Sequence, residues 1–119
     1  MKRNEFVEYV IGDQLAELPD MSARAMFSGY GIYKDGIIVG IVIDDELYLK
    51  ADETTKPEYE AMGSEPFTYE RKDGKSVVMS YYKVPSDILE NRSELVRLVE
   101  LSYDINLEKA VDKGRRKKK

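Results

Sequence analysis

The chain lacks two residue types on which many active sites and metal centres depend. Its 119 residues include no cysteine and no histidine. Without cysteine, the chain can form neither disulfides nor thiolate metal sites. Without histidine, it lacks the commonest general base at neutral pH and the commonest transition-metal ligand. Because catalysis would depend on carboxylates, lysine or tyrosine, the composition predicts a protein that is not an enzyme and that binds no cofactor.

Long apolar runs are also absent. No run approaches the roughly 20 residues that a membrane-spanning helix needs, and the polar start MKRNEFVEYV has no apolar signal-peptide core. The hydrophobic content of 42% in 119 residues is typical of one compact domain with a single core. We therefore expect a cytoplasmic protein with no membrane partner.

Positive charge is scarce except at the C-terminal end. The net charge is −4, and residues 1–112 alone hold 13 basic and 23 acidic residues, a net charge of −10. This distribution predicts a folded domain over 1–112 and a disordered basic tail over 113–119, because short runs of like charge repel themselves. A weak, salt-sensitive contact of the tail with nucleic acid is the alternative. The basic residues of the tail are Lys113, Arg115, Arg116, Lys117, Lys118 and Lys119.

The first half has the pattern of one helix and three antiparallel strands. Apolar residues recur at helical spacing after Asn4, a good N-cap residue, as far as Pro19. Asp35-Gly36 and Asp44-Asp45 are typical of tight hairpin turns, and we prefer the turn to a cation site at the second pair. The expected strands are 25–33, interrupted at Gly29 and Gly31, followed by 37–43 and 46–50.

The second half predicts a helix, a hairpin and a final helix. Thr55 and Glu58 have the spacing of a capping box for a helix over 55–62, and Asn91 is a candidate cap for the last helix. Strands are expected at 67–71 and 76–84, and 86–90 has room for one helical turn. The expected fold is α+β, with two layers, a five-stranded antiparallel sheet and the order α-β-β-β-α-β-β-α.

Four sequence blocks in this order resemble the N-terminal domain of the TfoX/Sxy family. They are RAMFSGYGIY at 24–33, LYLKAD at 47–52, GSEPFTY at 63–69 and MSYYKVP at 79–85. The similarity runs from about residue 5 to residue 105, and Ser28 stands where the family usually has glycine. The resemblance implies a secretion-chaperone-like fold and a regulator of natural competence thought to act with the cyclic AMP receptor protein. Founding members carry a second domain that we do not expect in this chain, so only part of that role is implied.

Glycines and amphipathic residues in these blocks have two interpretations. Gly29 and Gly31 fit a β-bulge in an ordinary sheet core, or they clear the backbone for a partner. Tyrosine and arginine are enriched at protein interfaces. The candidate interaction surface comprises Arg24, Phe27, Ser28, Gly29, Tyr30, Gly31, Tyr48, Lys50, Tyr69, Tyr81 and Tyr82.

Three functions then compete. The leading one is a non-catalytic module that binds a protein partner such as a transcription regulator, and that self-associates as a homodimer through an apolar sheet face or edge. The second is a nucleic-acid-associated regulator that uses the basic tail. The third, which the composition favours least, is an enzyme using carboxylates, lysine or tyrosine.

Overall fold

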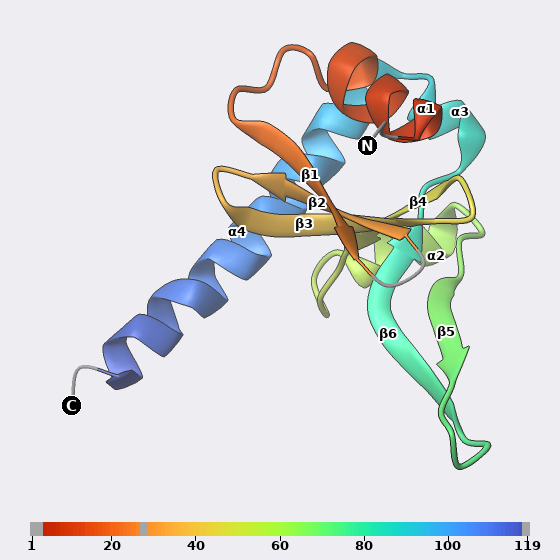
Figure 1. Cartoon of the computed structure of the whole chain (residues 1–119), viewed down its shortest axis with the longest axis vertical. Helices are drawn as coiled ribbons and strands as arrows, with labels where there is room; N and C mark the ends of the chain where they lie inside the picture. The colour runs from red at the N-terminus through yellow and green to blue at the C-terminus, as the bar shows by residue number, and fades with distance from the viewer. Residues whose placement is uncertain (1–3, 27–28, 118–119) are drawn as a thin grey trace.

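The computed structural model describes residues 4–26 and 29–117, with side chains described as far as Val111. The domain is α+β, with helices packed against an antiparallel sheet (Figure 1). Its elements are α1 (Glu5–Glu8), the π-helical η1 (Tyr9–Gln14), β1 (Met21–Met26), β2 (Gly29–Lys34), β3 (Ile37–Ile43), β4 (Glu46–Lys50), α2 (Lys56–Ala61), β5 (Pro66–Glu70), β6 (Ser76–Lys83), α3 (Ser86–Leu89) and α4 (Arg92–Lys117).

The sheet has six strands, so the expectation of five was wrong. Its order is β1-β2-β3-β4-β6-β5, and all neighbours are antiparallel. The segment expected as one strand over 25–33 is divided between β1 and β2, which pair from Met21 with Lys34 to Met26 with Gly29. The sequence of β1, MSARAM, contains no β-branched or aromatic residue, so its strand signal is weak and pairing with β2 decides its structure.

The predicted hairpin turns are confirmed. Asp35 and Gly36 have φ values of 50° and 77°, and Asp44 and Asp45 have 51° and 59°. Two consecutive residues with positive φ are the requirement of a type I′ turn, which matches the twist of the flanking strands. The side-chain amide of Asn4 donates to the Asp45 carboxylate at 2.9 Å, so this acidic pair serves the turn and the N-terminal helix cap.

The helix starts are only partly as expected. Asn4 caps α1, its side-chain oxygen accepting from the Phe6 N–H at 2.7 Å, but the α-helix ends at Glu8 and continues as the π-helical η1. At α2 the expected capping box is absent, because the Thr55 side chain makes no cap hydrogen bond. The Asp52 carboxylate instead accepts from the backbone N–H groups of Thr54 and Thr55.

The remaining helices follow the sequence more closely. The short α3 lies where one helical turn was expected. Asn91 caps α4, its side-chain oxygen accepting from the Glu94 N–H at 3.3 Å. Among the residues that the structure describes, no helix is both long enough and apolar enough to cross a membrane. The likeness to secretion-chaperone-like domains stays a prediction.

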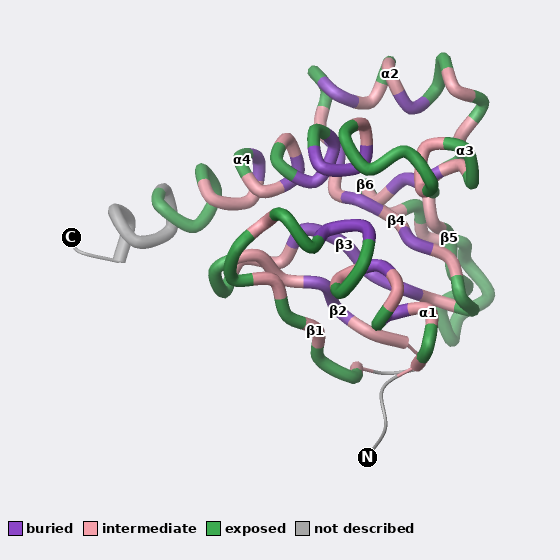
Figure 2. Tube along the Cα trace, turned by 90° about the horizontal axis from the view of Figure 1, so that it is seen from above, coloured by how far each residue is buried: buried purple, intermediate pink, exposed green. Residues whose placement is uncertain are grey.

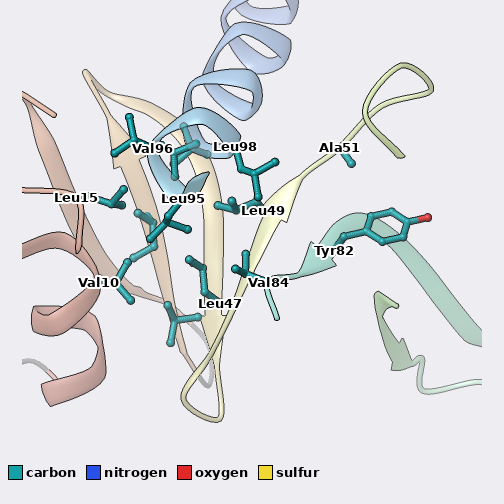
Figure 3. Packing of buried hydrophobic residues seen from close by; sticks show 14 of the residues in the cluster. Val10, Leu15, Leu47, Leu49, Ala51, Tyr82, Val84, Leu95, Val96 and Leu98 are labelled. Carbon is teal, nitrogen blue, oxygen red and sulfur yellow. The ribbon is translucent and has the colours of Figure 1, made fainter. Parts of the chain in front are cut away.

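The core lies between one face of the sheet and the helices (Figure 3). Leu95, Leu98 and Val99 of α4 pack with Leu47 and Leu49 of β4, and all five side chains are at most 2% exposed. On the other side of this core, the Tyr59 ring of α2 stacks on Tyr82 of β6, with ring centroids 5.5 Å apart. The N-terminal half of α4 is buried against the sheet, whereas its C-terminal half continues beyond it (Figure 2). This arrangement covers one face of the sheet, called here the covered face.

Candidate interaction surface

The opposite face of the sheet, called here the open face, is defined by strand alternation. Side chains of directly paired residues lie on the same face. Arg24 pairs with Gly31, Gly31 with Ile41, and Ile41 with Tyr48, so these four positions form one row across β1 to β4. Ile41 is 7% exposed, yet it does not belong to the core cluster that includes the helices. The open face therefore has its own buried apolar side chain, Ile41, on the side of the sheet away from α4.

A cavity of about 440 Å³ lies on the open face. Every lining residue that the structure describes belongs to a strand, from β1 at one edge of the sheet to β5 and β6 at the other. None of the described lining residues is acidic or basic, so these residues offer an apolar binding surface without an acid, a base or a charged ligand group. The lining residues are Met26, Tyr30, Ile41, Ile43, Phe67, Tyr69 and Met79.

Aromatic rings form one wall of this cavity. The Phe67 ring lies edge-on to Tyr48, with centroids 5.2 Å apart, and stacks on Tyr69 at 6.4 Å. Such pairs hold each other in a fixed geometry. Burial, followed by the negative charge of Glu46, raises the pKa of the Tyr48 hydroxyl. Tyr48 is therefore neutral at physiological pH and acts as a hydrogen-bonding aromatic surface, while Tyr69 is 46% exposed at the rim.

The two glycines of β2 allow the domain's own groups to approach closely. A Cβ at Gly31 would lie 2.8 Å from Met26 Sδ and 2.9 Å from Tyr33 Cε1, so these side chains occupy the space above it. A Cβ at Gly29 would lie 2.0 Å from the Val42 carbonyl oxygen. The expected bulge does not occur at these glycines, because the register of β2 with β3 shifts between Ile32 and Tyr33.

The structure brings together some of the predicted surface residues. Arg24, Gly31, Tyr48 and Tyr69 lie on the open face, and the Arg24 guanidinium carbon is 5.1 Å from the centroid of the Tyr33 ring.

Four further predicted residues differ in their placement. Tyr30 lines the cavity, and alternation puts Lys50 and Tyr81 on the same face as Tyr48 and Met79. Tyr82 is only 6% exposed, because alternation turns it toward Leu49 and the core, so its assignment to a surface was wrong. Tyr30 packs partly against the core, and its hydroxyl accepts from the Asn4 N–H at 3.3 Å. Lys50 and Tyr81 pair at the end of the sheet near α4.

Some predicted positions are not described. Phe27 and Ser28 lie outside the described residues, as do Lys118 and Lys119. The rest of the basic tail falls in the last turns of α4, beyond the side chains that the structure describes. The role of the tail therefore stays a prediction.

Sequence reasoning missed the apolar centre of the open face. Met26, Ile41, Ile43, Phe67 and Met79 line the cavity but were not among the candidate residues. The available signal was β3, IIVGIVI, whose apolar residues occupy both alternating sets of positions. A strand with this pattern needs cover on both faces, and the helices supply cover on one.

The other perturbed ionisable groups serve the structure. Hydrogen bonds from Arg97 lower the pKa values of Glu58 and Glu94, while Lys83 pairs with Glu46 at 2.8 Å. Burial raises the pKa of the Tyr59 hydroxyl far above its ordinary value. Within the described part of the chain, no group of three or more acidic residues is arranged to hold a metal ion.

Comparisons with known proteins agree with the sequence blocks. The profile of the TfoX N-terminal domain matches residues 13–105. The chain is 31% identical over 110 residues to Protein Sxy of Escherichia coli (strain K12), a match covering 92% of this chain and 52% of that protein. It is 28% identical over 101 residues to DNA transformation protein TfoX of Haemophilus influenzae, covering 84% and 46% respectively.

The chain thus spans about half the length of the curated relatives it matches. Neither relative carries the name of an enzyme. The profile match includes all six strands, and therefore the whole of the open face and its cavity. This chain belongs to the TfoX N-terminal domain family.

Proposed function

We propose that this domain is a non-catalytic regulatory module that binds another protein through the cavity of the open face. The observation that carries the proposal is an apolar, strand-lined cavity on the side of the sheet opposite the helices. Exposed apolar surface of this kind is costly in water and marks interaction sites in folded proteins. The name of the Haemophilus influenzae relative, a DNA transformation protein, supports a role in competence.

The lining of the cavity favours a protein segment as its occupant. Small-molecule sites usually combine apolar walls with several convergent polar groups that orient the ligand. Among the described lining residues, the polar side-chain groups are two tyrosine hydroxyls, and that of Tyr30 already accepts from Asn4. Apolar side chains of a partner need no such groups, because burial of their surface supplies the free energy. The family resemblance implies a transcription regulator, the cyclic AMP receptor protein, as the first partner to test.

The test introduces a charge into the cavity. Ile43→Asp places a carboxylate against apolar walls, where it would remain unpaired when a partner covers it. We expect its affinity for the cyclic AMP receptor protein of the same organism to fall by about tenfold or more. The measurement is biolayer interferometry with the intact chain, the receptor protein and cyclic AMP, and circular dichroism checks that the variant is folded.

The matched control is Val78→Asp. Val78 is apolar and 64% exposed, and it alternates with Met79, so it points to the other side of β6. This variant should bind like the wild type. Equal losses in both variants, or no loss in Ile43→Asp, would contradict the proposal. Sedimentation of the same proteins tests the homodimer, because a second copy seated in the cavity predicts a wild-type dimer that Ile43→Asp dissociates.

A further inference from the structure

The two edges of the sheet differ in how well they are protected. The strand order places β1 at one edge and β5 at the other. β5 begins with Pro66, which has no backbone N–H, and its register with β6 shifts between Pro66 and Thr68. Proline and irregular register keep an edge strand from pairing with another chain. β1 contains no proline and pairs with β2 without a register shift, so it is the edge open to a further strand.

The hydrogen bonds of β1 show which of its backbone groups point away from the sheet. In an antiparallel pair, residues that exchange hydrogen bonds alternate with residues that do not. The Asp35 N–H donates to the Asp20 carbonyl oxygen at 2.9 Å, so the residues of β1 that bond to β2 are Ser22, Arg24 and Met26. The N–H and C=O groups that point outward therefore belong to Met21, Ala23 and Ala25. Among the described residues, none bonds to these outward groups.

The outer side of β1 is accessible to a partner. β1 lies at the margin of the domain, and half of its residues are exposed (Figure 2). The strand Met21–Met26 extends over about 20 Å, enough for a ladder with a segment of similar length. Each outward residue offers one donor and one acceptor. Main-chain hydrogen bonds of this kind give affinity in strand addition, while side chains give specificity.

The side chains of an added strand would continue the open face. Arg24 and Met26 both lie on this face of β1, and Met26 lines the cavity. A strand paired with β1 therefore places one side chain beside Arg24 and, two residues along, another beside Met26. The second side chain reaches the cavity at the edge of the sheet.

The charges at this edge favour an acidic residue beside Arg24. Arg24 is exposed, it is the one charged residue of β1, and its guanidinium carbon lies 5.1 Å from the centroid of the Tyr33 ring. It forms no salt bridge among the described side chains. A guanidinium matches a carboxylate with two parallel hydrogen bonds. Beside Met26 an apolar side chain is favoured, because the described lining of the cavity carries no charge.

We propose that the partner protein binds as an extended segment that adds a further strand along β1, with an acidic residue beside Arg24 and an apolar residue beside Met26. Because the added strand carries its apolar side chain to the cavity of the open face, the proposal rests on the proposed function. It specifies the conformation of the partner segment and the pattern of its side chains.

A second copy of this chain fits the edge less well. Antiparallel pairing of two β1 strands through their outward residues has its fullest overlap when Ala23 pairs with Ala23 of the second copy. In that register, Arg24 lies opposite a serine, Ser22, and apolar Met26 lies opposite Asp20. Neither side chain then meets the chemistry that suits it.

The test begins with a selection for segments that bind the full chain. The probe is a phage-displayed library of random peptides of roughly twelve residues, long enough to span β1. We expect the enriched peptides to carry an acidic and an apolar residue two positions apart, among residues that favour strands. One enriched peptide is then labelled with fluorescein, and its affinity is measured by fluorescence anisotropy.

Ala25→Pro removes one of the outward N–H groups. Ala25 is exposed and its N–H is not part of the ladder with β2, so an edge strand tolerates proline there. The peptide affinity should fall about tenfold, because a hydrogen bond is lost and the ring obstructs the added strand. The matched control is Ala25→Thr, which keeps the N–H and should bind within about twofold of the wild type. Circular dichroism checks that both variants are folded.

Two changes to the peptide test the same contacts without altering the fold of the domain. N-methylation of alternate peptide nitrogens should abolish binding, because it removes the donors of the added strand. Replacing the acidic residue by its amide should weaken binding about threefold to the wild type but leave binding to Arg24→Gln unchanged.

The possible results separate this proposal from the proposed function. Enriched peptides without the acidic residue, or equal affinities for Ala25→Pro and Ala25→Thr, would overturn the added strand. A wild-type dimer in sedimentation that Ala25→Pro dissociates would also overturn it, because a second copy would occupy the edge. Loss of binding in Ile43→Asp with none in Ala25→Pro would leave only the cavity. Unchanged binding by Ile43→Asp, or no enriched peptide, would contradict the proposed function and the added strand together.

Discussion

Both faces of the sheet carry apolar side chains, but the two faces differ in what covers them. On the covered face, Leu47 and Leu49 are 2% exposed or less because α4 packs on them. On the open face, Ile43 and Met79 are half-buried around a cavity, and Tyr69 is 46% exposed. The first face therefore stabilises the fold, whereas the second retains apolar surface that a partner can bury.

This difference in cover changes how much free energy each apolar side chain contributes to folding. Burial of apolar surface contributes about 25 cal/mol per Å² only where water is excluded. A side chain that borders a cavity is only partly buried and contributes less of this free energy. Shortening it should therefore lower the stability of the domain only slightly. Substitutions on the covered face should therefore lower the stability of the domain, whereas substitutions on the open face should mainly weaken binding.

The largest effect is expected when one buried side chain on the covered face and one side chain on the open face are each shortened to alanine. Leu49→Ala should lower the free energy of unfolding by about 2–5 kcal/mol, because Leu49 is fully buried beneath α4. Ile43→Ala should cost no more than about 1 kcal/mol, because its side chain already borders a cavity. Urea unfolding of both variants measures the difference. Similar losses would mean that the open face is packed as tightly as the covered face.

A smaller effect is expected from adding a methyl group on each face. At Gly40, paired with Leu49 on the covered face, an added Cβ would lie 2.6 Å from the backbone oxygen of Tyr48. Gly40→Ala should therefore cost about 1–3 kcal/mol, because the paired strand has to move. Gly31→Ala meets the Met26 and Tyr33 side chains instead. Met26 can change rotamer, so thermal unfolding should show a smaller loss; a larger loss for Gly31→Ala would reverse the comparison.

The smallest effect concerns the ion pairs outside the covered face. Arg97 of α4 bonds Glu58 of α2 and Glu94, and these hydrogen bonds lower the pKa values of both carboxyl groups below 4.5. Their contribution to stability is full above pH 4.5 and is lost as pH falls through the lowered folded-state values. Arg97→Gln should slightly lower the unfolding temperature at pH 7, because the pairs are exposed and screened by water.

The pH dependence supplies the control for that prediction. In acid, below the folded-state pKa values, both glutamates are protonated in either protein, so the difference between wild type and Arg97→Gln should vanish. A difference that persists in acid would show that Arg97 acts through packing of its aliphatic stem.

Several features could be predicted from local sequence because their causes are local. The Asp35-Gly36 and Asp44-Asp45 turns depend on residues that tolerate positive φ, and Asn4 and Asn91 cap the helices that follow them. The edge strand β1 could not be predicted, because MSARAM becomes a strand only through its pairing with β2. Tyr82 was misplaced for a related reason. Its neighbours Tyr81 and Lys83 gave no sign of which alternating set would meet α2.

The sequence by itself determined the kind of protein: α+β, without cysteine or histidine chemistry, with apolar residues on both sides of β3. Only the tertiary structure decided which side α4 would cover, and thus that Ile41 and Ile43 would border an open cavity while Arg97 of α4 met Glu58 of α2. The physical reason is the separation along the chain of the residues that determine each feature. Alternation along a strand is set by adjacent residues, whereas cover and the meeting of charges depend on segments that are far apart in the chain.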